Sequence, residues 1–419
     1  MAFHPATSIN LSRLRELLDG INQFGREDDS PGLNRPAFSE SDMAARRWLV
    51  GQIEDAGLHA DIDAAGNVIG TWRVEGDAPL VMVGSHTDTV IAGGAYDGAL
   101  GVAVGLECIK AMKEAGVAPA RSIAVVSTSD EEGRFGGMLG SEALAGIVTE
   151  EWVQSSVDAD GIRLWDVMSA AGFDPARVSR AALAKGSVAA FVELHIEQGP
   201  TLEKAGKPIG LVDVISGVCN WTIRLKGVAN HAGSTPMAER ADAFAGLAEV
   251  AVAIPEVIAA HGTDYAKITI GKVDLQPNTP HTIPGEAEFS VIFKEAEEAA
   301  MRRLADGFAE HVRRAAQNHR LEHEIEEHSW LPPVALDTDL RQAVREAAEA
   351  KSIDYLVLPS GGAHDAQTMT ALCPTALIFV PSKGGVSHSP DEQTSWDDIA
   401  IGADLMLATL MRLTTSTRS

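Results

Sequence analysis

Four short apolar runs organise the chain. Unbroken apolar runs of this length are typical of strands that are buried on both faces, as in a parallel sheet. Each run ends in, or just before, a cluster of His, Asp or Glu. Because sites in open α/β sheets form beyond the carboxyl ends of the strands, we expect these polar residues to meet at one edge of the sheet. The runs are Leu80–Val83, Ile123–Val126, Ala189–Val192 and Ala376–Val380.

Helices are predicted between and after these runs, from Ala99 to Glu114, from Leu340 to Lys351 and from Trp396 to Leu413. Strands that alternate with helices indicate an α/β domain with a mostly parallel central sheet.

The segment 213–330 has a different pattern, in which half-exposed strands and amphipathic helices follow the order β-α-β-β-α-β. This order is that of the ferredoxin-like fold. We therefore expect a small α+β domain, inserted into a catalytic domain made of residues 1–212 and 331–419. The predicted elements are strand 221–226, helix 236–260, strands 267–275 and 286–294, helix 295–318 and strand 321–330.

Composition and charge narrow the function classes. A chain of 419 residues exceeds what one core usually serves, which agrees with two domains. The formal net charge of −25 argues against a nucleic-acid partner and against an anionic membrane surface. No window offers the ~20 apolar residues of a membrane span, and the N-terminus lacks the apolar core of a signal peptide. With three widely spaced cysteines and no disulfide framework, the sequence indicates a cytoplasmic protein.

Five positions near the strand ends are candidate metal ligands. Each alone has an ordinary structural explanation, such as a helix cap for an Asp or a solvated loop for adjacent acids. Together they suit two divalent ions, each with two ligands of its own and one shared bridge. Without thiolates, the set accepts zinc or manganese, and also cobalt or nickel. The candidates are His86, Asp97, one of the acids in Asp130–Glu132, His195 and His388.

The neighbouring acids have further uses. Asp88, two residues from His86, is placed to hold the second ring nitrogen of that histidine. If one of the adjacent acids binds metal, its neighbour can serve as general base toward a water molecule. The chain has no G-x-S-x-G elbow of a serine hydrolase and no phosphate-binding loop, so metal-assisted hydrolysis is the reaction class that the residues favour.

These motifs resemble those of the M20 metallopeptidase-like amidohydrolases, and within them the hydantoinase/carbamoylase group. That group includes N-carbamoyl-L-amino-acid hydrolases, β-ureidopropionases and allantoate amidohydrolases. The resemblance implies a phosphorylase/hydrolase-like catalytic domain with an inserted lid and dimerisation domain, a homodimer, and hydrolysis of a C–N bond in an N-carbamoyl (ureido) amino acid or related small acid. The matching stretches, spread from about residue 84 to 392, are GSHTDTV, GGAYDGALGV, DEEGRFGGMLGS, ELHIEQGPTLEKAG, GVANHAGSTPMAERADA, GGAHDA and GVSHSPDE.

The resemblance also implies a role for each matched residue. It implies that His86 and His195 hold one ion, that Glu132 and His388 hold the other, and that Asp97 bridges the two ions. Asp88 would orient His86, and Glu131 would be the catalytic base. Gln198 would contact the substrate, and His231 would stabilise the tetrahedral oxyanion and could reach the site of a partner subunit.

Two departures concern substrate recognition. In the group, an Asn in the stretch P-N-x-x-N-V-I-P and an Arg thirteen residues later together grip the substrate carboxylate. This chain has His281 and Lys294 at those positions. Lysine keeps the charge but loses the bidentate fork.

Three functions therefore stay open. An N-carbamoyl or ureido acid is the first choice of substrate, and an N-acyl-amino-acid or conjugate amide is the alternative. A metal-binding assembly protein without activity is disfavoured, because Glu131 is retained. His364 and Asp365 lie in a matched motif, but the sequence assigns them no role.

Overall fold

The computed structural model describes residues 7–27 and 30–415, so the first six residues of the segment considered for a signal peptide lie outside it. The chain divides into two compact units. Unit 1 comprises the residues through Asp213 and those from Leu336 onward, and unit 2 comprises Val214–Ala335. The inserted domain was predicted at 213–330, so its limits differ by one and by five residues from those of unit 2.

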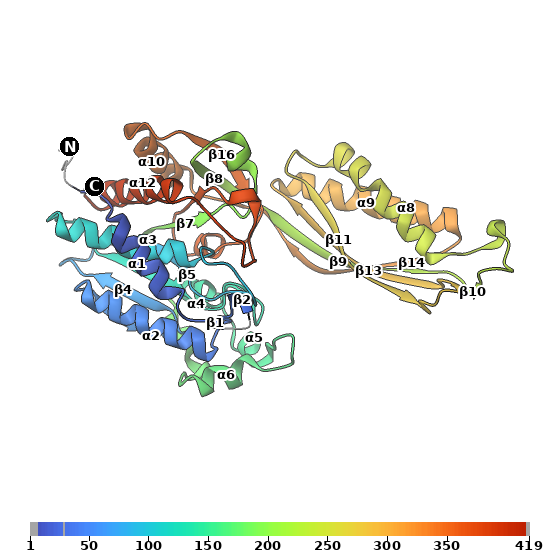
Figure 1. Ribbon diagram of the computed structural model, residues 1–419, viewed down its shortest axis with the longest axis horizontal. Coiled ribbons are helices and arrows are strands. Elements are labelled where there is room, and N and C mark those ends of the chain that lie inside the picture. Colours follow the sequence, from blue (N-terminus) through green and yellow to red (C-terminus); the bar gives the residue numbers. More distant parts are fainter. Residues whose placement is uncertain (1–6, 28–29, 416–419) are drawn as a thin grey trace. The chain divides into compact units, whose positions relative to one another are not determined.

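A mixed sheet forms the core of unit 1 (Figure 1). Its centre consists of parallel strands in the order β17 (Thr375–Val380), β7 (Val188–Ile196), β5 (Leu80–His86) and β6 (Ile123–Thr128). These strands contain the apolar runs, which confirms the predicted parallel centre. Antiparallel pairing extends the sheet on both sides, with β8 (Ile209–Ile215) beside β17, and β4 (Val68–Trp72) and β3 (His59–Ile62) beyond β6. β16 (Tyr355–Ser360) pairs with β8, and so does β15 (Val334–Ala335), which is formed by the last two residues of the unit 2 range.

Helices cover this sheet. α3 (Ala99–Glu114) packs against β5, β6 and β7, and α12 (Trp396–Thr415) packs against α3 and β17. α3 is apolar on nearly all sides and is buried along most of its length, as expected for a helix inside a core. The other elements of unit 1 are α1 (Leu11–Ile21), β1 (Arg26–Glu27), β2 (Ser30–Leu33), α2 (Glu40–Asp55), α4 (Leu139–Ala145), α5 (Glu150–Ser155), α6 (Leu164–Ala170), α7 (Thr201–Ala205), α10 (Thr338–Ala350), α11 (Asp365–Met369) and the 3₁₀ helices Pro175–Ala181 and Lys383–Gly385.

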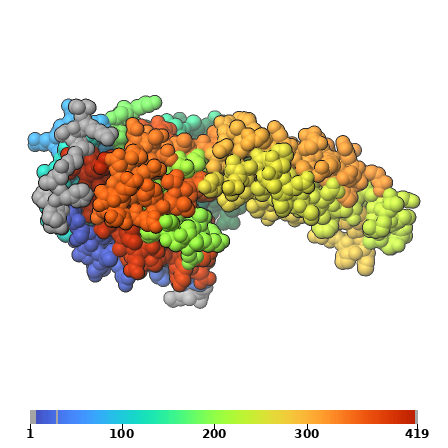
Figure 2. All heavy atoms as spheres, turned by 90° about the horizontal axis from the view of Figure 1, so that it is seen from above, coloured from blue at the N-terminus to red at the C-terminus, as the bar shows by residue number. Residues whose placement is uncertain are grey.

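Unit 2 has the predicted ferredoxin-like topology. Its antiparallel sheet has the strand order β11-β13-β9-β14, and the apolar side chains of one sheet face pack against two helices, α8 and α9. Figure 2 looks onto these helices, whose atoms are yellow to orange. The elements are β9 (Gly217–Lys226), β10 (Asn230–His231), a 3₁₀ turn (Met237–Glu239), α8 (Ala243–His261), β11 (Lys267–Gln276), β12 (Thr282–Ile283), β13 (Glu286–Glu295), α9 (Glu298–His319) and β14 (Glu322–Leu331).

Helix α8 differs from the prediction in two respects. It begins at Ala243 and not near residue 236, because the carboxylate of Asp242 accepts hydrogen bonds from the backbone of Phe244 and Ala245 and so caps the helix there. By length and composition α8 is also apolar enough to cross a membrane, which the sequence analysis did not anticipate. A single helix of this kind is a weak indication, since core helices have the same composition, and Leu247 and Val250 pack into the core of unit 2.

Candidate metal centre

The candidate ligands come from the carboxyl ends of the central strands of unit 1. His86 is the last residue of β5, and His195 is the last but one of β7. Glu132 follows β6, His388 follows β17, and Asp97 lies in the turn before α3. Because the four strands are parallel, their ends lie at the same edge of the sheet, and the structure brings all five residues together there.

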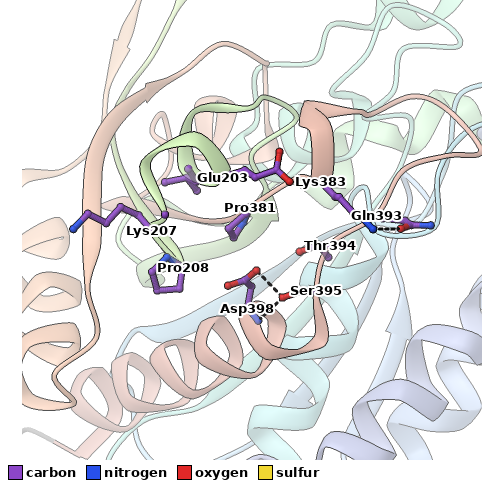
Figure 3. A pocket seen from close by; sticks show the side chains of 11 residues that line it. Glu203, Lys207, Pro208, Pro381, Lys383, Gln393, Thr394, Ser395 and Asp398 are labelled. Carbon is purple, nitrogen blue, oxygen red and sulfur yellow. Dashed lines mark hydrogen bonds between the residues drawn. The ribbon is translucent and has the colours of Figure 1, made fainter.

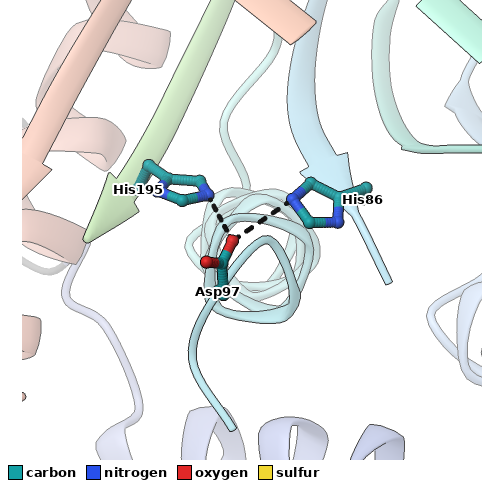
Figure 4. A group of neighbouring side chains, drawn as sticks. All are labelled: His86, Asp97 and His195. Carbon is teal, nitrogen blue, oxygen red and sulfur yellow. Dashed lines mark ion pairs between the residues drawn. The ribbon is translucent and has the colours of Figure 1, made fainter. Parts of the chain in front are cut away.

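Asp97 lies between two sets of side chains. Its Oδ1 is 3.0 Å from Nε2 of His195 and 3.4 Å from Nε2 of His86 (Figure 4). Its Oδ2 is 3.4 Å from Nε2 of His388, and that nitrogen is 3.2 Å from Oε2 of Glu132. Each set has its ligand atoms close enough to surround one cation. The carboxylate of Asp97 therefore presents one oxygen to each set.

The spacing and the chemistry of these atoms fit divalent ions. Ligand atoms at ~2.1 Å from a tetrahedral zinc ion lie ~3.4 Å from one another, close to the separations given above. Nε2 of His86 is buried and has no hydrogen-bond partner among the described residues, although carboxylate oxygens of Asp97 and Glu131 lie 3.4 Å away. Nδ1 of His86 and Nδ1 of His195 lie 3.0 and 2.9 Å from the carbonyl oxygens of Asp88 and Ile196. With the proton on Nδ1, Nε2 of His86 offers its lone pair to an ion, and Nε2 of His195 offers the lone pair that here accepts the backbone N–H of Gly98 at 3.1 Å.

Opposite charges dominate the protonation of this cluster in the absence of an ion. Burial acts to raise the pKa of Asp97, but the neighbouring histidines lower it well below its usual range. Hydrogen bonds with Asp97 and Glu132 raise the pKa of His388 to about 10. Protonated imidazoles thus supply the positive charge that a cation would bring to these carboxylates.

Glu131 has the opposite environment. Its side chain is buried, with Oε2 3.4 Å from Nε2 of His86, while that of Glu132 turns toward His388. Burial raises the pKa of Glu131 well above its usual range, and the charges of nearby carboxylates, Asp365 first among them, raise it further against the effect of His86. Such surroundings favour the protonated form of the carboxyl group, from which a general acid donates its proton.

Asp88 makes contacts that differ from the predicted ones. Oδ1 of its carboxylate lies 3.8 Å from Nδ1 of His86, beyond hydrogen-bond distance, whereas its backbone carbonyl lies at 3.0 Å. The carboxylate accepts hydrogen bonds from the backbone N–H groups of Glu131, at 3.4 Å, and Glu132, at 3.1 Å. Asp88 therefore holds His86 through its carbonyl group and the acidic turn through its side chain.

The residues predicted to contact substrate lie in three places. Gln198, which follows β7, donates from Nε2 to Oδ2 of Asp97 at 2.7 Å and so lies at the metal cluster. His231 and His281 lie together in unit 2, where β10 pairs with β12 and the N–H of Ala232 donates to the carbonyl of His281 at 3.0 Å. Lys294 lies near the end of β13.

His281 and Lys294 are separated by the length of β13. Glu286 pairs with Lys226 at one end of the strand, and Lys294 pairs with Val218 near the other end. At ~3.4 Å per residue these positions are roughly 27 Å apart. The His281 and Lys294 of one chain therefore do not form the joint grip on a small carboxylate that the resemblance implies.

The tautomer of His231 follows from its hydrogen bonds. Its Nδ1 accepts from the backbone N–H groups of Gly233, at 3.0 Å, and Ser234, at 3.1 Å. The ring proton must then be on Nε2, which points the side chain's donor away from its own turn.

Some polar residues of the cluster were not singled out from the sequence. Glu193 accepts a hydrogen bond from Oγ of Ser85 at 2.6 Å, and with His195 and His364 it forms a third group of candidate ligand atoms. Ser387 and Glu392 contact the Asp97 turn. Glu193 lies in the stretch ELHIEQGP, and Ser387 and Glu392 lie in GVSHSPDE. These matches were the only indication of a role in the sequence, because the residues that they contact are remote along the chain.

The chain is similar over most of its length to known proteins of one peptidase family. A sequence model of peptidase family M20/M25/M40 matches residues 57–412. The N-carbamoyl-L-amino acid amidohydrolase of Geobacillus stearothermophilus is 37% identical over 407 residues, which cover 96% of this chain and 98% of that protein. The allantoate amidohydrolase of Bacillus subtilis is 32% identical, with 96% and 97% covered. The ureidoglycolate hydrolase of Oryza sativa is 32% identical, with 96% and 84% covered.

Solved structures agree over the whole chain. An amidase of the hydantoinase/carbamoylase family from Burkholderia multivorans superimposes with a TM-score of 0.89 at 33% identity, covering 97% of this chain and 99% of that one. AtUAH in complex with glyoxylate superimposes with a TM-score of 0.82 at 30% identity, covering 99% and 100%.

Proposed function

The chain belongs to peptidase family M20/M25/M40 and, within it, to the hydantoinase/carbamoylase group, and from this premise we propose that it hydrolyses an N-carbamoyl or ureido acid at two divalent ions. It is thus a metal-dependent hydrolase of C–N bonds other than peptide bonds. Zinc or manganese suits the imidazole and carboxylate ligands best.

The observation that carries the proposal is the arrangement around Asp97. One carboxylate oxygen lies among the imidazoles of His86 and His195, and the other lies beside His388 and Glu132. A bridging carboxylate between two ligand sets is the arrangement expected of a two-ion hydrolase. When bound, the ions supply Lewis acidity toward the scissile carbonyl and lower the pKa of a water molecule to ~7.

Glu131 is the proposed proton carrier. Water adds to the ureido carbonyl, and Glu131 takes the proton that this water gives up. The bond from the carbonyl carbon to the amino-acid nitrogen then breaks, and the proton moves from Glu131 to that nitrogen. The carbamic acid that remains decomposes to carbon dioxide and ammonia. The position of Glu131 supports this role, because its buried carboxyl group lies beside the ligand His86 and binds no second candidate ligand as Glu132 does.

His231 is the proposed donor to the oxyanion. With Nδ1 occupied by two backbone N–H groups, its Nε2–H is free to donate to the developing negative charge. A donor of this kind contributes about 3 kcal/mol to the stability of a transition state.

We further propose that the enzyme acts as a homodimer. Lys294 and the histidine pair His231 and His281 lie at opposite ends of one unit 2, so a substrate that touches both ends needs residues from two copies. The cytoplasm is the expected location, since the three cysteines are buried and free.

The test is ammonia release from a panel of N-carbamoyl amino acids and ureido acids. Chelator-stripped protein is assayed with and without added Mn²⁺ or Zn²⁺, and Glu131→Gln serves as the control. We expect metal-dependent ammonia release that falls by about 10²- to 10⁴-fold in the variant while the amount of bound metal is unchanged.

No ammonia from any member of the panel would contradict the carbamoyl and ureido assignment. The same samples are then assayed for free amine from N-acyl-amino acids and amide conjugates. Metal-dependent amine release that depends on Glu131 would assign the alternative substrate class, which the changed residues His281 and Lys294 favour.

A further inference from the structure

The loop of residues 381–395, named here the His388 loop, carries the most exposed of the candidate ligands. The side chain of His388 is 50% exposed, whereas those of His86 and His195 are 1% exposed. The backbone of His388 has a φ of 52°, a left-handed conformation that costs free energy for a residue with a side chain. Neither a strand nor burial therefore holds this ligand in place.

One side of the His388 loop faces open space. Pro381, Lys383 and Gln393 of the loop line a cavity of about 570 Å³, together with Glu203 and Lys207 (Figure 3). None of the candidate metal ligands lines this cavity. On that side Glu203 holds the backbone of Gly384, but no contact there reaches the ion ligands, so the position of His388 relative to Asp97 depends on the polar contacts of the other side of the loop.

Glu392 makes those contacts. Its Oε1 accepts hydrogen bonds from the backbone N–H groups of Tyr96, at 2.9 Å, and Asp97, at 3.0 Å. Its Oε2 lies 2.8 Å from Oγ of Ser387, which is also 3.0 Å from Oδ2 of Asp97. The Glu392 carboxylate thus connects Ser387, the residue before His388, to the backbone of Asp97, while the hydroxyl of Ser387 itself lies beside the side chain of Asp97.

The fit of Glu392 is close. Its side chain is 3% exposed, and a Cβ atom on Gly94 would lie 2.1 Å from Oε1, so the turn before Asp97 leaves room for this carboxylate only because residue 94 is glycine. Burying a carboxylate is unfavourable unless hydrogen-bond donors replace its water. The two amides and the hydroxyl are such donors, and all three belong to segments that carry candidate ligands.

We propose that Glu392 is a positioning residue that fastens the His388 loop to the Asp97 turn and thereby assembles the ion site of Asp97, Glu132 and His388. The inference rests on the two-ion centre of the proposed function. The other ion site takes its histidines from β5 and β7 and shares only Asp97 with the site that the loop completes, so it depends much less on the loop.

The experiment is a calorimetric titration of chelator-stripped protein with Mn²⁺, which counts ions and gives an affinity for each. Glu392→Ala removes the acceptor of both amides and releases Ser387. We expect one of the two ions, that of the His388 site, to bind about 10- to 100-fold less tightly and the other to change by less than about threefold.

The conservative variant separates position from charge. In Glu392→Gln, the amide oxygen can accept from Tyr96 and Asp97, and the amide nitrogen can donate to Oγ of Ser387. We therefore expect both ions to bind within about threefold of the wild-type affinity. A Gln variant as weak as the Ala variant would overturn the positioning role, because the charge alone would then matter.

The matched control is Glu203→Ala. Oε2 of Glu203 accepts from the backbone of Gly384 at 2.8 Å, so it anchors the same loop without contact to Asp97. Both ions should bind it as they bind the wild type. If Glu392→Ala does not fold, as judged by its melting curve, Ser387→Ala replaces it, since it cuts the link to Asp97 without leaving amides unpaired. This variant should weaken the binding of the ion at the His388 site several-fold.

Equal weakening of both ions, or no change in either, would overturn the inference. Ion counting does not depend on turnover, so the two proposals can fail separately. Wild-type protein that binds two Mn²⁺ ions but releases neither ammonia nor amine would refute the proposed function alone. Wild-type protein that binds a single Mn²⁺ ion would overturn both.

Discussion

Protons and metal ions compete for the same atoms of the candidate centre. Nε2 of His388 lies between carboxylates of Asp97 and Glu132, and their hydrogen bonds raise its pKa to about 10. Since the ordinary value is 6.5, the ion-free centre holds this proton throughout the neutral range. An ion that binds at His388 must displace it.

Ion binding should therefore tighten as the pH rises. The raised pKa of His388 stabilises the ion-free protein fully below pH 6.5, and this stabilisation is lost as the pH rises through about 10. The contribution is small, because the side chain is half exposed. We expect Mn²⁺ titrations in buffers of different ionisation enthalpy to show the release of nearly one proton from His388 at pH 7, and of about half a proton at pH 10. A constant proton count across this range would contradict the prediction.

Lys294 sets a second residue-level prediction. Lys294→Arg restores a bidentate fork for a carboxylate, so KM for an acid substrate should fall several-fold with kcat nearly unchanged. The matched control is Lys267→Arg, since Lys267 pairs with Lys294 across the sheet but is not at a matched position of the group. An unchanged KM in Lys294→Arg would remove this residue from the carboxylate grip.

At the level of elements, helix caps decide where helices begin. Asp242 caps α8 with two hydrogen bonds to the backbone of Phe244 and Ala245. Asp242→Ala should lower the free energy of unfolding of unit 2, which contains α8, by about 1 kcal/mol. Urea unfolding followed by circular dichroism measures this loss. Asp242→Asn should recover most of it, because the amide oxygen can accept the same bonds.

The central strands could be predicted from the sequence because their signal is local. Apolar runs such as Ile123–Val126 are long enough to identify a buried strand, and parallel pairing then determines which ends meet. The segment between β6 and β7 gave no such signal, and its short helices α4, α5 and α6 were not predicted. The role of Glu392 could not be predicted for another reason. Its partner Asp97 lies 295 residues away along the chain, and only the tertiary fold brings the two residues together.

The start of α8 shows how one residue changes an element. The stretch after Pro236 is rich in alanine, and its composition alone favours a helix there. The helix begins only after Asp242, six residues later, because that side chain caps it, and Met237–Glu239 form a separate 3₁₀ turn. The polar contacts of Asp88 were likewise beyond the sequence, because spacing does not distinguish a carbonyl from a carboxylate contact.

At the level of the whole molecule, the two ends of unit 2 lead to a complementation test. His231→Ala and Lys294→Ala should each have low activity. If each site takes Lys294 from one copy and His231 from the other, a mixed dimer has one intact site. Dimers purified through two different tags should then recover about half of the wild-type kcat.

The control for this test uses two changes at the same end. His231 and His281 lie together, so a mixed dimer of His231→Ala and His281→Ala has no intact site and should stay inactive. Recovery in this control as well, or no recovery in the first pair, would refute the sharing of sites between copies.

The chain enters and leaves unit 2 at neighbouring positions, since Val218 of β9 pairs with Leu331 of β14. Paired residues of antiparallel strands lie about 5 Å apart, a gap that a short turn can close. A gene segment encoding unit 2 can therefore be gained, lost or exchanged without rearranging the strands that carry the ion ligands. Evolution can therefore conserve the metal chemistry encoded in the unit 1 segments while the substrate preference changes through the unit 2 segment.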